Sequence, residues 1–158
     1  MGREMKKFLS KNSIRIDWQD ADVFHYCNNK ATLFPLVNQL RKMKVVMIGP
    51  AHLRAVDERL FPYAHFIEIP AKNCYLSVDE IQKQLLDIYD KSGPAVFAFS
   101  ASMTTNVLIQ KLYPVMGKTS WMIDFGSLWD VYVGVHSRGG YAKEDWTERM
   151  NKNCGVSL

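Results

Sequence analysis

The residues of this chain best suited to acid–base chemistry lie just after a short apolar run near residue 120. Asp124 follows Trp-Met-Ile, and Asp130 and His136 come within a dozen residues of it. A carboxylate at the end of a strand can act as a general base or bind ribose or a metal ion, and histidine is the side chain that titrates near neutral pH. Asp124 is therefore a candidate catalytic residue, and His136 is the candidate titrating histidine. A structural role in capping loops is the simpler alternative for Asp124, as a solvated loop position is for His136.

A second group of residues suits the binding of phosphate. Ser100, Ala101, Ser102 and Thr104 are small or carry hydroxyls, and they lead directly into a predicted helix. Small side chains allow a ligand to approach closely, hydroxyls donate hydrogen bonds, and the start of a helix carries partial positive charge. The stretch predicts a cradle for a phosphate or carboxylate group. The alternative is that Ser102 only caps the helix.

Two further strand ends have features of nucleotide sites. Gly49 and Pro50 follow an apolar run, where glycine would let a ligand approach the backbone and the next helix would offer free N–H groups. Glu68 comes about twenty residues later, the spacing at which an acid binds ribose hydroxyls in dinucleotide-binding folds. A plain tight turn and an edge-strand residue facing water are the respective alternatives.

The segment after Asp124 supplies the remaining candidates for substrate binding. Arg138 stands in a Gly-flanked segment suited to closing over a diphosphate, with pairing to a surface acid as the alternative. The other candidates in this segment are Gly126, Ser127, Tyr132 and Ser137.

His25 lies in an aromatic stretch near the N-terminus. It could face the crevice formed by these strand ends, or it could simply be packed against neighbouring side chains.

The elements that must position these residues alternate regularly along the chain. Continuous apolar runs at 45–50, 65–70, 94–100 and 120–126 predict strands buried in a parallel sheet. Helical periodicity predicts helices at about 51–60, from Ser77 to Gly93, at 104–116 and at about 31–42, with Ser77 and Glu80 forming a capping box. Residues 13–18 predict a further strand.

Repeated strand–helix–strand units with right-handed crossovers predict an α/β fold. We expect an open parallel sheet of at least four strands with helices on both faces, a Rossmann-like arrangement whose ligand crevice lies beyond the carboxyl ends of the strands. The chain is expected to form one domain over residues 1–158. Residues 1–43 would be a helical N-terminal extension, and residues 129–158, with Trp146 as the anchor, a lid or a dimer-forming arm.

Composition excludes several other classes of protein. The 47% hydrophobic and 23% charged residues fit a folded domain, and no apolar run approaches the ~18 residues of a membrane helix. Three widely spaced cysteines without C-x-x-C argue against disulfides and cysteine zinc sites, and favour a reducing cytoplasm. The net charge of +4 could favour phosphorylated ligands, but no nucleic-acid-binding motif accompanies it. The motifs of P-loop NTPases, H-E-x-x-H zinc proteases and standard α/β-hydrolases are also missing from the sequence.

Three stretches together resemble the small GT-D-type glycosyltransferases. They are Val45-Val46-Met47-Ile48-Gly49-Pro50, Phe99-Ser100-Ala101-Ser102, and Ile123-Asp124-Phe125-Gly126-Ser127-Leu128-Trp129-Asp130. The likeness spans about residues 44–138. It implies a nucleotide-sugar donor at the strand ends and a divalent metal, Mn²⁺ or Mg²⁺, held by an Asp-x-Glu motif. Here that motif reads Asp130-Val131-Tyr132, so Asp130, alone or with Asp124, would have to hold the metal.

The resemblance implies transfer of a sugar from a nucleoside diphosphate to an acceptor hydroxyl, with Asp124 or Asp130 as base or metal ligand. Two other classes stay open: another nucleotide- or S-adenosylmethionine-binding Rossmann enzyme, and a non-catalytic α/β binding module. A homodimer could complete the acceptor pocket of so short a chain.

Overall fold

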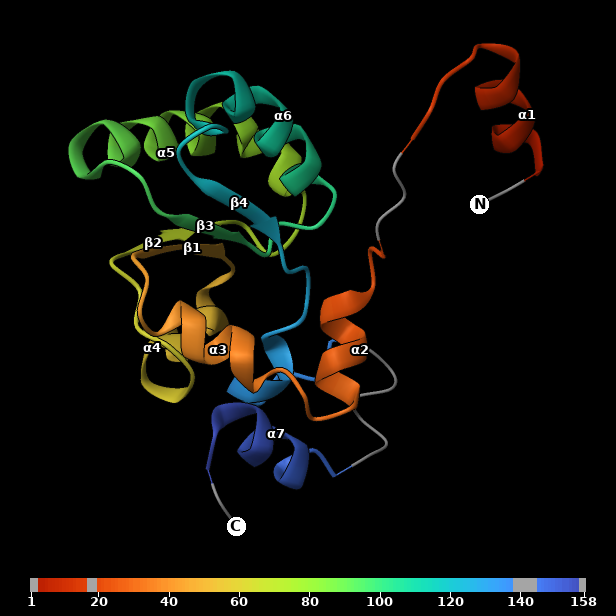
Figure 1. Cartoon of the computed structure of the whole chain (residues 1–158). Helices are drawn as coiled ribbons and strands as arrows, with labels where there is room; N and C mark the ends of the chain where they lie inside the picture. Colours follow the sequence, from red (N-terminus) through yellow and green to blue (C-terminus); the bar gives the residue numbers. More distant parts are fainter. Residues whose placement is uncertain (1–2, 17–19, 138–144, 157–158) are drawn as a thin grey trace.

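A four-stranded, fully parallel sheet forms the centre of the protein, as a computed structural model shows for residues 3–16, 20–137 and 145–156 (Figure 1). The strands are β1 (Val45–Gly49), β2 (His65–Glu68), β3 (Val96–Phe99) and β4 (Trp121–Asp124), in the spatial order β2-β1-β3-β4. Every pair of neighbours is parallel. The predicted α/β class and the four predicted strands are confirmed.

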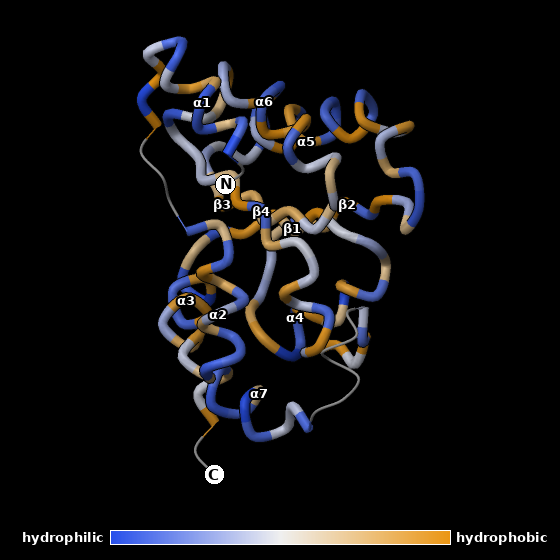
Figure 2. Tube along the Cα trace, turned by 90° about the vertical axis from the view of Figure 1, so that its right-hand side faces the viewer, coloured by the Kyte–Doolittle hydropathy of each residue, from blue (hydrophilic) through white to orange (hydrophobic). Residues whose placement is uncertain are grey.

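The two central strands are apolar because both of their faces are covered. All five residues of β1 and all four of β3 are buried, whereas the edge strands β2 and β4 are partly exposed. Along β1, Val45 and Met47 face one hydrophobic cluster while Val46 and Ile48 face the other. Figure 2 shows hydrophobic residues concentrated along the strands, between two helical layers. A buried parallel strand is expected to look like this.

Helices cover both faces of the sheet, as predicted. One face carries α5 (Val78–Ser92) and α6 (Thr104–Met116), and the other carries α2 (Val23–Asn29), α3 (Phe34–Leu40), α4 (Val56–Arg59) and α7 (Thr147–Cys154) (Figure 1). Short 3₁₀ helices follow three of the strands: η1 (Ala51–Ala55), η2 (Cys74–Ser77) and η3 (Asp130–Val133). None of the described helices is long and apolar enough to cross a bilayer.

The N-terminal extension is helical, but its predicted strand is wrong for the residues that the structure describes. The first helix, α1 (Arg3–Lys11), buries no residue. Ser13 lies in a turn and residues 14–16 have no regular structure, with Ile14 and Ile16 exposed, so they are not hydrogen-bonded to the sheet as a strand. Residues 17 and 18 of that prediction lie outside the described ranges.

Three helix predictions need correction in detail. The helix expected at 31–42 begins only at Phe34, because Pro35 suits the first turn and Ala31 has a left-handed backbone. The helix expected at 51–60 is split into η1 and α4. The capping box is wrong because Ser77 ends η2, and its hydroxyl makes no capping hydrogen bond to α5. The helix predicted at 104–116 is confirmed to the residue.

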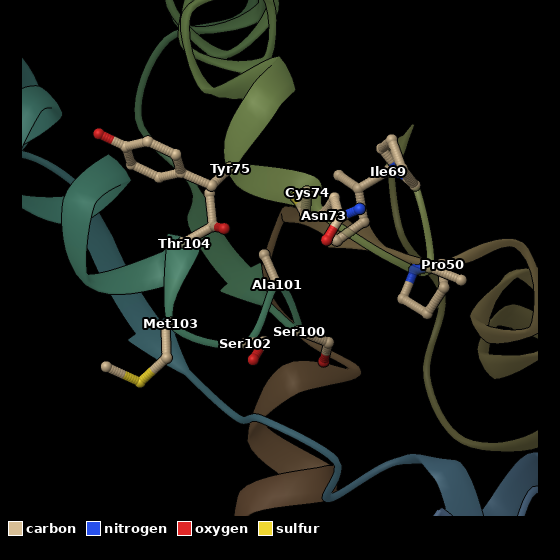
Figure 3. Close-up of a pocket in the computed structure, with 12 residues that line it drawn as sticks. Pro50, Ile69, Asn73, Cys74, Tyr75, Ser100, Ala101, Ser102, Met103 and Thr104 are labelled. Carbon is tan, nitrogen blue, oxygen red and sulfur yellow. The ribbon is translucent and has the colours of Figure 1, made fainter.

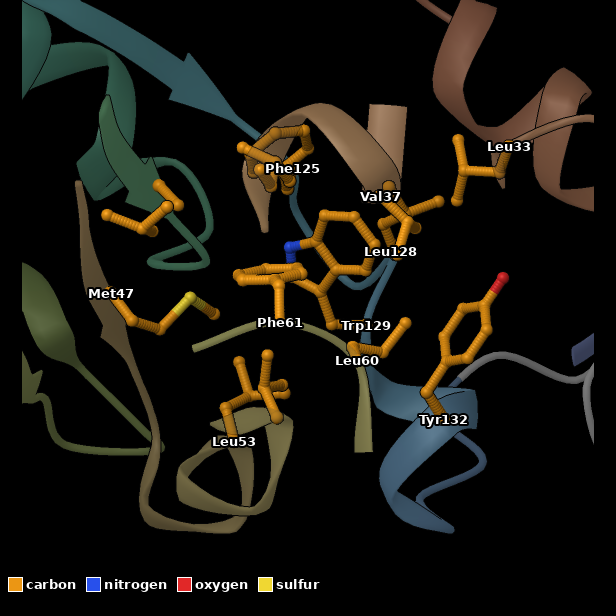
Figure 4. Packing of buried hydrophobic residues seen from close by; sticks show 14 of the residues in the cluster. Leu33, Val37, Met47, Leu53, Leu60, Phe61, Phe125, Leu128, Trp129 and Tyr132 are labelled. Carbon is orange, nitrogen blue, oxygen red and sulfur yellow. The ribbon is translucent and has the colours of Figure 1, made fainter. Parts of the chain in front are cut away.

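The segment after β4 belongs to the core as far as the structure describes it. The indole of Trp129 is fully buried (Figure 4). The distance between ring centroids is 4.9 Å from Trp129 to Phe125 and 5.2 Å from Trp129 to Phe61. Trp146, the predicted anchor of the C-terminal segment, is buried in the same cluster. The described part of the predicted lid or arm therefore packs as a structural layer beneath the sheet.

A buried polar network joins three segments far apart in the sequence. The hydroxyl of Tyr132 donates to Asn28 Oδ1 at 2.5 Å, and Asn153 Nδ2 donates to the Tyr132 hydroxyl at 2.9 Å. Asn153 Oδ1 also accepts from the backbone N–H of Leu33 at 2.7 Å. Because Asn28 and Asn153 are completely buried, this network fixes α2, η3 and α7 relative to one another.

Replacing Asn153 with Ala should destabilise the protein by about 2–4 kcal/mol, because it leaves the Leu33 N–H and the Tyr132 hydroxyl short of partners in the interior. Urea unfolding followed by circular dichroism measures the change. Asn29→Ala, at an exposed position of α2, is the control and should change the free energy of unfolding by less than about 0.5 kcal/mol. Equal effects of the two variants would contradict the role of the network.

Candidate functional site

The carboxyl ends of the strands are tied together at one edge of the sheet. The N–H of Ser100 donates to Ile48 O at 2.7 Å, and the N–H of Phe125 donates to Phe99 O at 2.8 Å. On the other side, the N–H of Ile69 donates to Gly49 O at 3.1 Å. The chain leaves β1 toward β2 on one side, while β3 lies on the other, so the strand order reverses between β1 and β3. Open α/β sheets bind ligands beyond that reversal.

A recess lies at this reversal point, and we name it the switch-point recess (Figure 3). Its volume is about 260 Å³. One wall follows β2, the opposite wall follows β3, and Pro50 after β1 lies between them. No charged side chain among the described residues lines it. The lining residues are Pro50, Ile69, Pro70, Ala71, Asn73, Cys74, Tyr75, Ser100, Ala101, Ser102, Met103 and Thr104.

Ser100, which lines this recess, carries a buried hydroxyl without a hydrogen-bond partner. The residue is 8% exposed, and its Oγ is fully buried without a hydrogen-bond partner. An unpaired buried hydroxyl costs roughly 1–3 kcal/mol, so such groups are rare unless something else satisfies them. The start of α6, with its partial positive charge, lines the same recess through Thr104. The predicted stretch 100–104 therefore lies together on one wall.

Ser102 does not cap α6. The helix is preceded by Met103, no side chain caps it, and Ser102 itself has a left-handed backbone with φ of 54°. Thr105 Oγ1 accepts a hydrogen bond from the N–H of Ala101 instead, at 3.2 Å. A left-handed serine costs about 1–2 kcal/mol relative to ordinary backbone. The capping alternative for Ser102 is therefore wrong, and its backbone is strained where it lines the recess.

The opposite wall contains a second left-handed residue. Asn73 has φ of 55° and precedes η2, whose N–H of Leu76 donates to Asn73 O at 3.0 Å. Next to it, Cys74 contacts Thr104 of the other wall: burial raises the pKa of its thiol, and the hydrogen bond with Thr104 partly offsets that rise. The two walls are thus in contact at one end of the recess.

The structure gives Gly49 a packing role. A Cβ built on Gly49 would lie 2.7 Å from Leu53 Cδ1 and 3.5 Å from Ser100 Cβ. The missing side chain lets η1 pack closely on the end of β1, and the space is taken by the buried Leu53. Pro50, by contrast, lines the recess as predicted.

Glu68 does not line the switch-point recess. It ends the edge strand β2, and its Oε2 lies 3.0 Å from the Arg54 guanidinium, with both side chains about half exposed. Arg54 also lies over the ring of Phe66, 4.5 Å from its centroid. This is the edge position facing water that the sequence left open as the alternative to a ribose-binding acid.

Asp130 is paired with a histidine that sequence reasoning did not single out. His52 Nε2 lies 3.0 Å from Asp130 Oδ1, and only 9% of the Asp130 side chain is exposed. The pair connects η1, which follows β1, with η3, which follows β4. The position of His52, two residues after Pro50 at a strand end, was the available signal. The described residues contain no group of three or more His, Cys, Asp or Glu side chains arranged to hold a metal ion. Metal binding by Asp130 stays a prediction.

Asp124 lies in a second recess, of about 220 Å³, where the start of α2 meets the end of β4. His25 lines the same recess, as the sequence suggested it could. Asp124 Oδ1 accepts from the N–H of Gly126 at 2.9 Å, and Gly126 takes a left-handed turn with φ of 53°. Desolvation by neighbouring groups raises the pKa of Asp124, although the residue has a solvent-exposed surface, and the Gly126 hydrogen bond opposes that rise.

Four of the remaining predicted residues, all within the described ranges, line neither recess. The Tyr132 hydroxyl lies in the buried network with Asn28 and Asn153. Ser127 is half-buried, and His136 and Ser137 are exposed. Arg138 lies outside the described residues.

Comparison of the chain with protein-family models, curated proteins and solved structures found no match.

The raised pKa of Asp124 should appear in the pH dependence of stability. The folded protein holds the Asp124 proton more tightly than the unfolded chain does, so this residue's contribution to stability falls as pH rises above its ordinary pKa of 3.8. Asp124→Asn has no carboxyl group to ionise, so it does not lose stability in this way as pH rises. The stability of the variant relative to wild type should therefore increase between about pH 4 and pH 7, as measured by urea unfolding at each pH.

Asp145→Asn is the matched control because the pKa of Asp145 is lowered, by hydrogen bonds from the side chain and backbone of Thr147. Its wild-type carboxylate contributes stability that is lost as pH falls, so the pH dependence of this control should have the opposite sign. If the stability of both variants relative to wild type changed with pH in the same direction, the environment described for Asp124 would be contradicted.

Proposed function

We propose that this protein is a glycosyltransferase that binds a nucleoside-diphosphate sugar at the carboxyl ends of its strands and transfers the sugar to an acceptor hydroxyl. The observation that supports it best is the unpartnered, buried hydroxyl of Ser100, a residue that lines the switch-point recess together with Thr104 at the start of α6. A phosphate oxygen is an acceptor for that hydroxyl and is stabilised by the helix N-terminus. The resemblance of residues 44–138 to GT-D-type glycosyltransferases agrees with this choice.

In the proposed reaction, the acceptor oxygen forms a bond to the anomeric carbon while the bond from that carbon to the diphosphate oxygen breaks. The bonding electron pair leaves with the diphosphate, whose growing charge is stabilised by Ser100 and the N–H groups at the start of α6. The acceptor proton passes to a carboxylate. Asp124 is the candidate, because one of its oxygens is held by Gly126 and it lies in a recess at the same edge of the sheet.

The site supports a nucleotide-sugar donor better than S-adenosylmethionine. Both ligands contain ribose, and Glu68, the acid that could have bound it, is paired with Arg54 outside the recess. Only the nucleotide sugar carries a diphosphate that the start of α6 can stabilise. S-adenosylmethionine is accordingly included below as a ligand whose binding would favour the other enzyme class.

The proposal is tested by thermal unfolding of the protein with nucleoside diphosphates, nucleotide sugars or S-adenosylmethionine, each with and without Mn²⁺. A nucleotide sugar at ~100 times its dissociation constant should add about 2.7 kcal/mol of stability. Release of nucleoside diphosphate should then be faster with an acceptor alcohol than in water alone. Stabilisation by S-adenosylmethionine alone, or by none of these ligands, would contradict the proposal.

Ser100→Ala should separate ligand binding from stability. Removing an unpaired buried hydroxyl leaves the free energy of unfolding unchanged or raises it by up to about 1 kcal/mol, because no hydrogen bond within the protein is lost. The affinity for the nucleoside diphosphate should fall about tenfold, as expected for losing one hydrogen bond to a charged group. Calorimetry measures both the free energy of unfolding and the affinity for the nucleoside diphosphate. Ser10→Ala, on the exposed helix α1, is the control and should change neither. Unchanged affinity in Ser100→Ala would show that the hydroxyl does not contact the ligand.

A further inference from the structure

We infer that Asn73 reads the nucleobase of the donor, with its carboxamide bonded to one edge of the heterocycle while the diphosphate lies against Ser100 and α6. This inference rests on the proposed function and concerns the other wall of the same recess. Its basis is a juxtaposition: Asn73 and Ser100 lie on opposite walls of the recess, whereas the Tyr75 ring points away from it (Figure 3).

The carboxamide of Asn73 is available to a ligand. The residue is exposed, and within the described chain only its backbone oxygen takes part in a hydrogen bond, with the N–H of Leu76. Its side chain does not cap η2. A carboxamide offers a donor and an acceptor side by side, the pattern that lets asparagine pair with a base edge through two hydrogen bonds.

The backbone at Asn73 explains why an asparagine can stand there. Its φ of 55° is in the left-handed region, which asparagine tolerates better than other side-chain-bearing residues. This backbone presents the side chain from the turn before η2. Ser102, across the recess, is the other left-handed residue of the lining. Both walls therefore hold sparsely populated backbone, which is concentrated at binding sites in proteins.

The chemistry around Asn73 favours a heterocycle over ribose. Its neighbours in the lining include Pro50, Ile69, Pro70 and Ala71, whose apolar surfaces suit the face of a planar ring. Ribose hydroxyls are read by carboxylates in this fold class, and no described carboxylate lines the recess. A planar ring with adjacent donor and acceptor atoms, between apolar walls and one carboxamide, is the ligand chemistry that fits.

The test compares pyrophosphate, which lacks a base, with UDP, CDP, GDP and ADP, using isothermal calorimetry on the full chain. At least one nucleoside diphosphate should bind about tenfold or more tightly than pyrophosphate to the wild-type protein. Asn73→Gly keeps the left-handed backbone and removes the carboxamide. It should lose that tenfold preference while its affinity for pyrophosphate stays within about twofold of wild type.

A second variant and a control make the result specific. Asn73→Asp keeps the size of the side chain and replaces the NH₂ donor with an acceptor, so it should also lose the preference. Asn29→Ala, at an exposed position of α2 that does not line the recess, should retain it.

The outcomes separate this inference from the proposed function. If pyrophosphate and all four nucleotides fail to bind, the anion site itself is wrong, and the inference is overturned together with the proposed function. If pyrophosphate binds but no nucleotide binds more tightly, or if Asn73→Gly keeps the preference, only the reading of the base by Asn73 is overturned.

Discussion

Burial of both faces of β1 and β3 determines how the other strands and the helices are arranged. Every residue of these two strands is buried, and they pair with each other at the centre of the sheet. Because they are parallel, their carboxyl ends reach the same edge, where the backbone hydrogen bond from Ser100 to Ile48 aligns them. The switch-point recess exists because the chain must leave β1 and β3 in different directions at that point.

The polar groups at this edge are held by the apolar layers on either side. On the α5 and α6 side, the contact between Cys74 and Thr104 joins the two walls of the recess. On the other side, Trp129 and the network of Asn28, Tyr132 and Asn153 fix the segment that follows β4. The protein keeps an unpaired hydroxyl at Ser100 and left-handed residues at Asn73 and Ser102, all of which cost stability. Similar costs occur outside the recess, at the left-handed Ala31 and the unpartnered Asn28 Nδ2. The recess is the place where three of them lie together with the start of a helix.

Periodicity along the sequence was enough to predict the fold, because each buried strand is a continuous apolar run bounded by turn residues. The bounds of α6 could be predicted to the residue, since Gly117 ends its apolar pattern. The capping box was wrong because Ser77 belongs to the end of η2, and its side chain makes no capping hydrogen bond to α5. The strand was wrong over residues 13–16 because a strand needs an unpaired sheet edge, which local sequence does not specify.

The candidate site was predictable only where the strand-end rule applies directly. Ser100, Ala101, Ser102, Thr104 and Pro50 do line one recess. The rule does not specify which face of an edge strand a side chain occupies, so it could not decide between the two interpretations of Glu68. It also could not show that the Tyr132 hydroxyl is buried in a polar network, that Asn73 lines the recess, or that His52 pairs with Asp130. Asn73 lies five residues beyond the end of β2, and His52 is recognised only through its contact with Asp130.

A phosphate site at the strand ends can be tested by titrating ¹⁵N-labelled protein with pyrophosphate and following the backbone amide signals in NMR spectra. An anion held at the start of α6 should cause saturable shifts that are largest for Ser102, Met103, Thr104 and Thr105, with smaller shifts for residues 69–73 across the recess. Shifts confined to basic surface residues such as those of α1, or no saturable shift at all, would contradict a phosphate site at the strand ends.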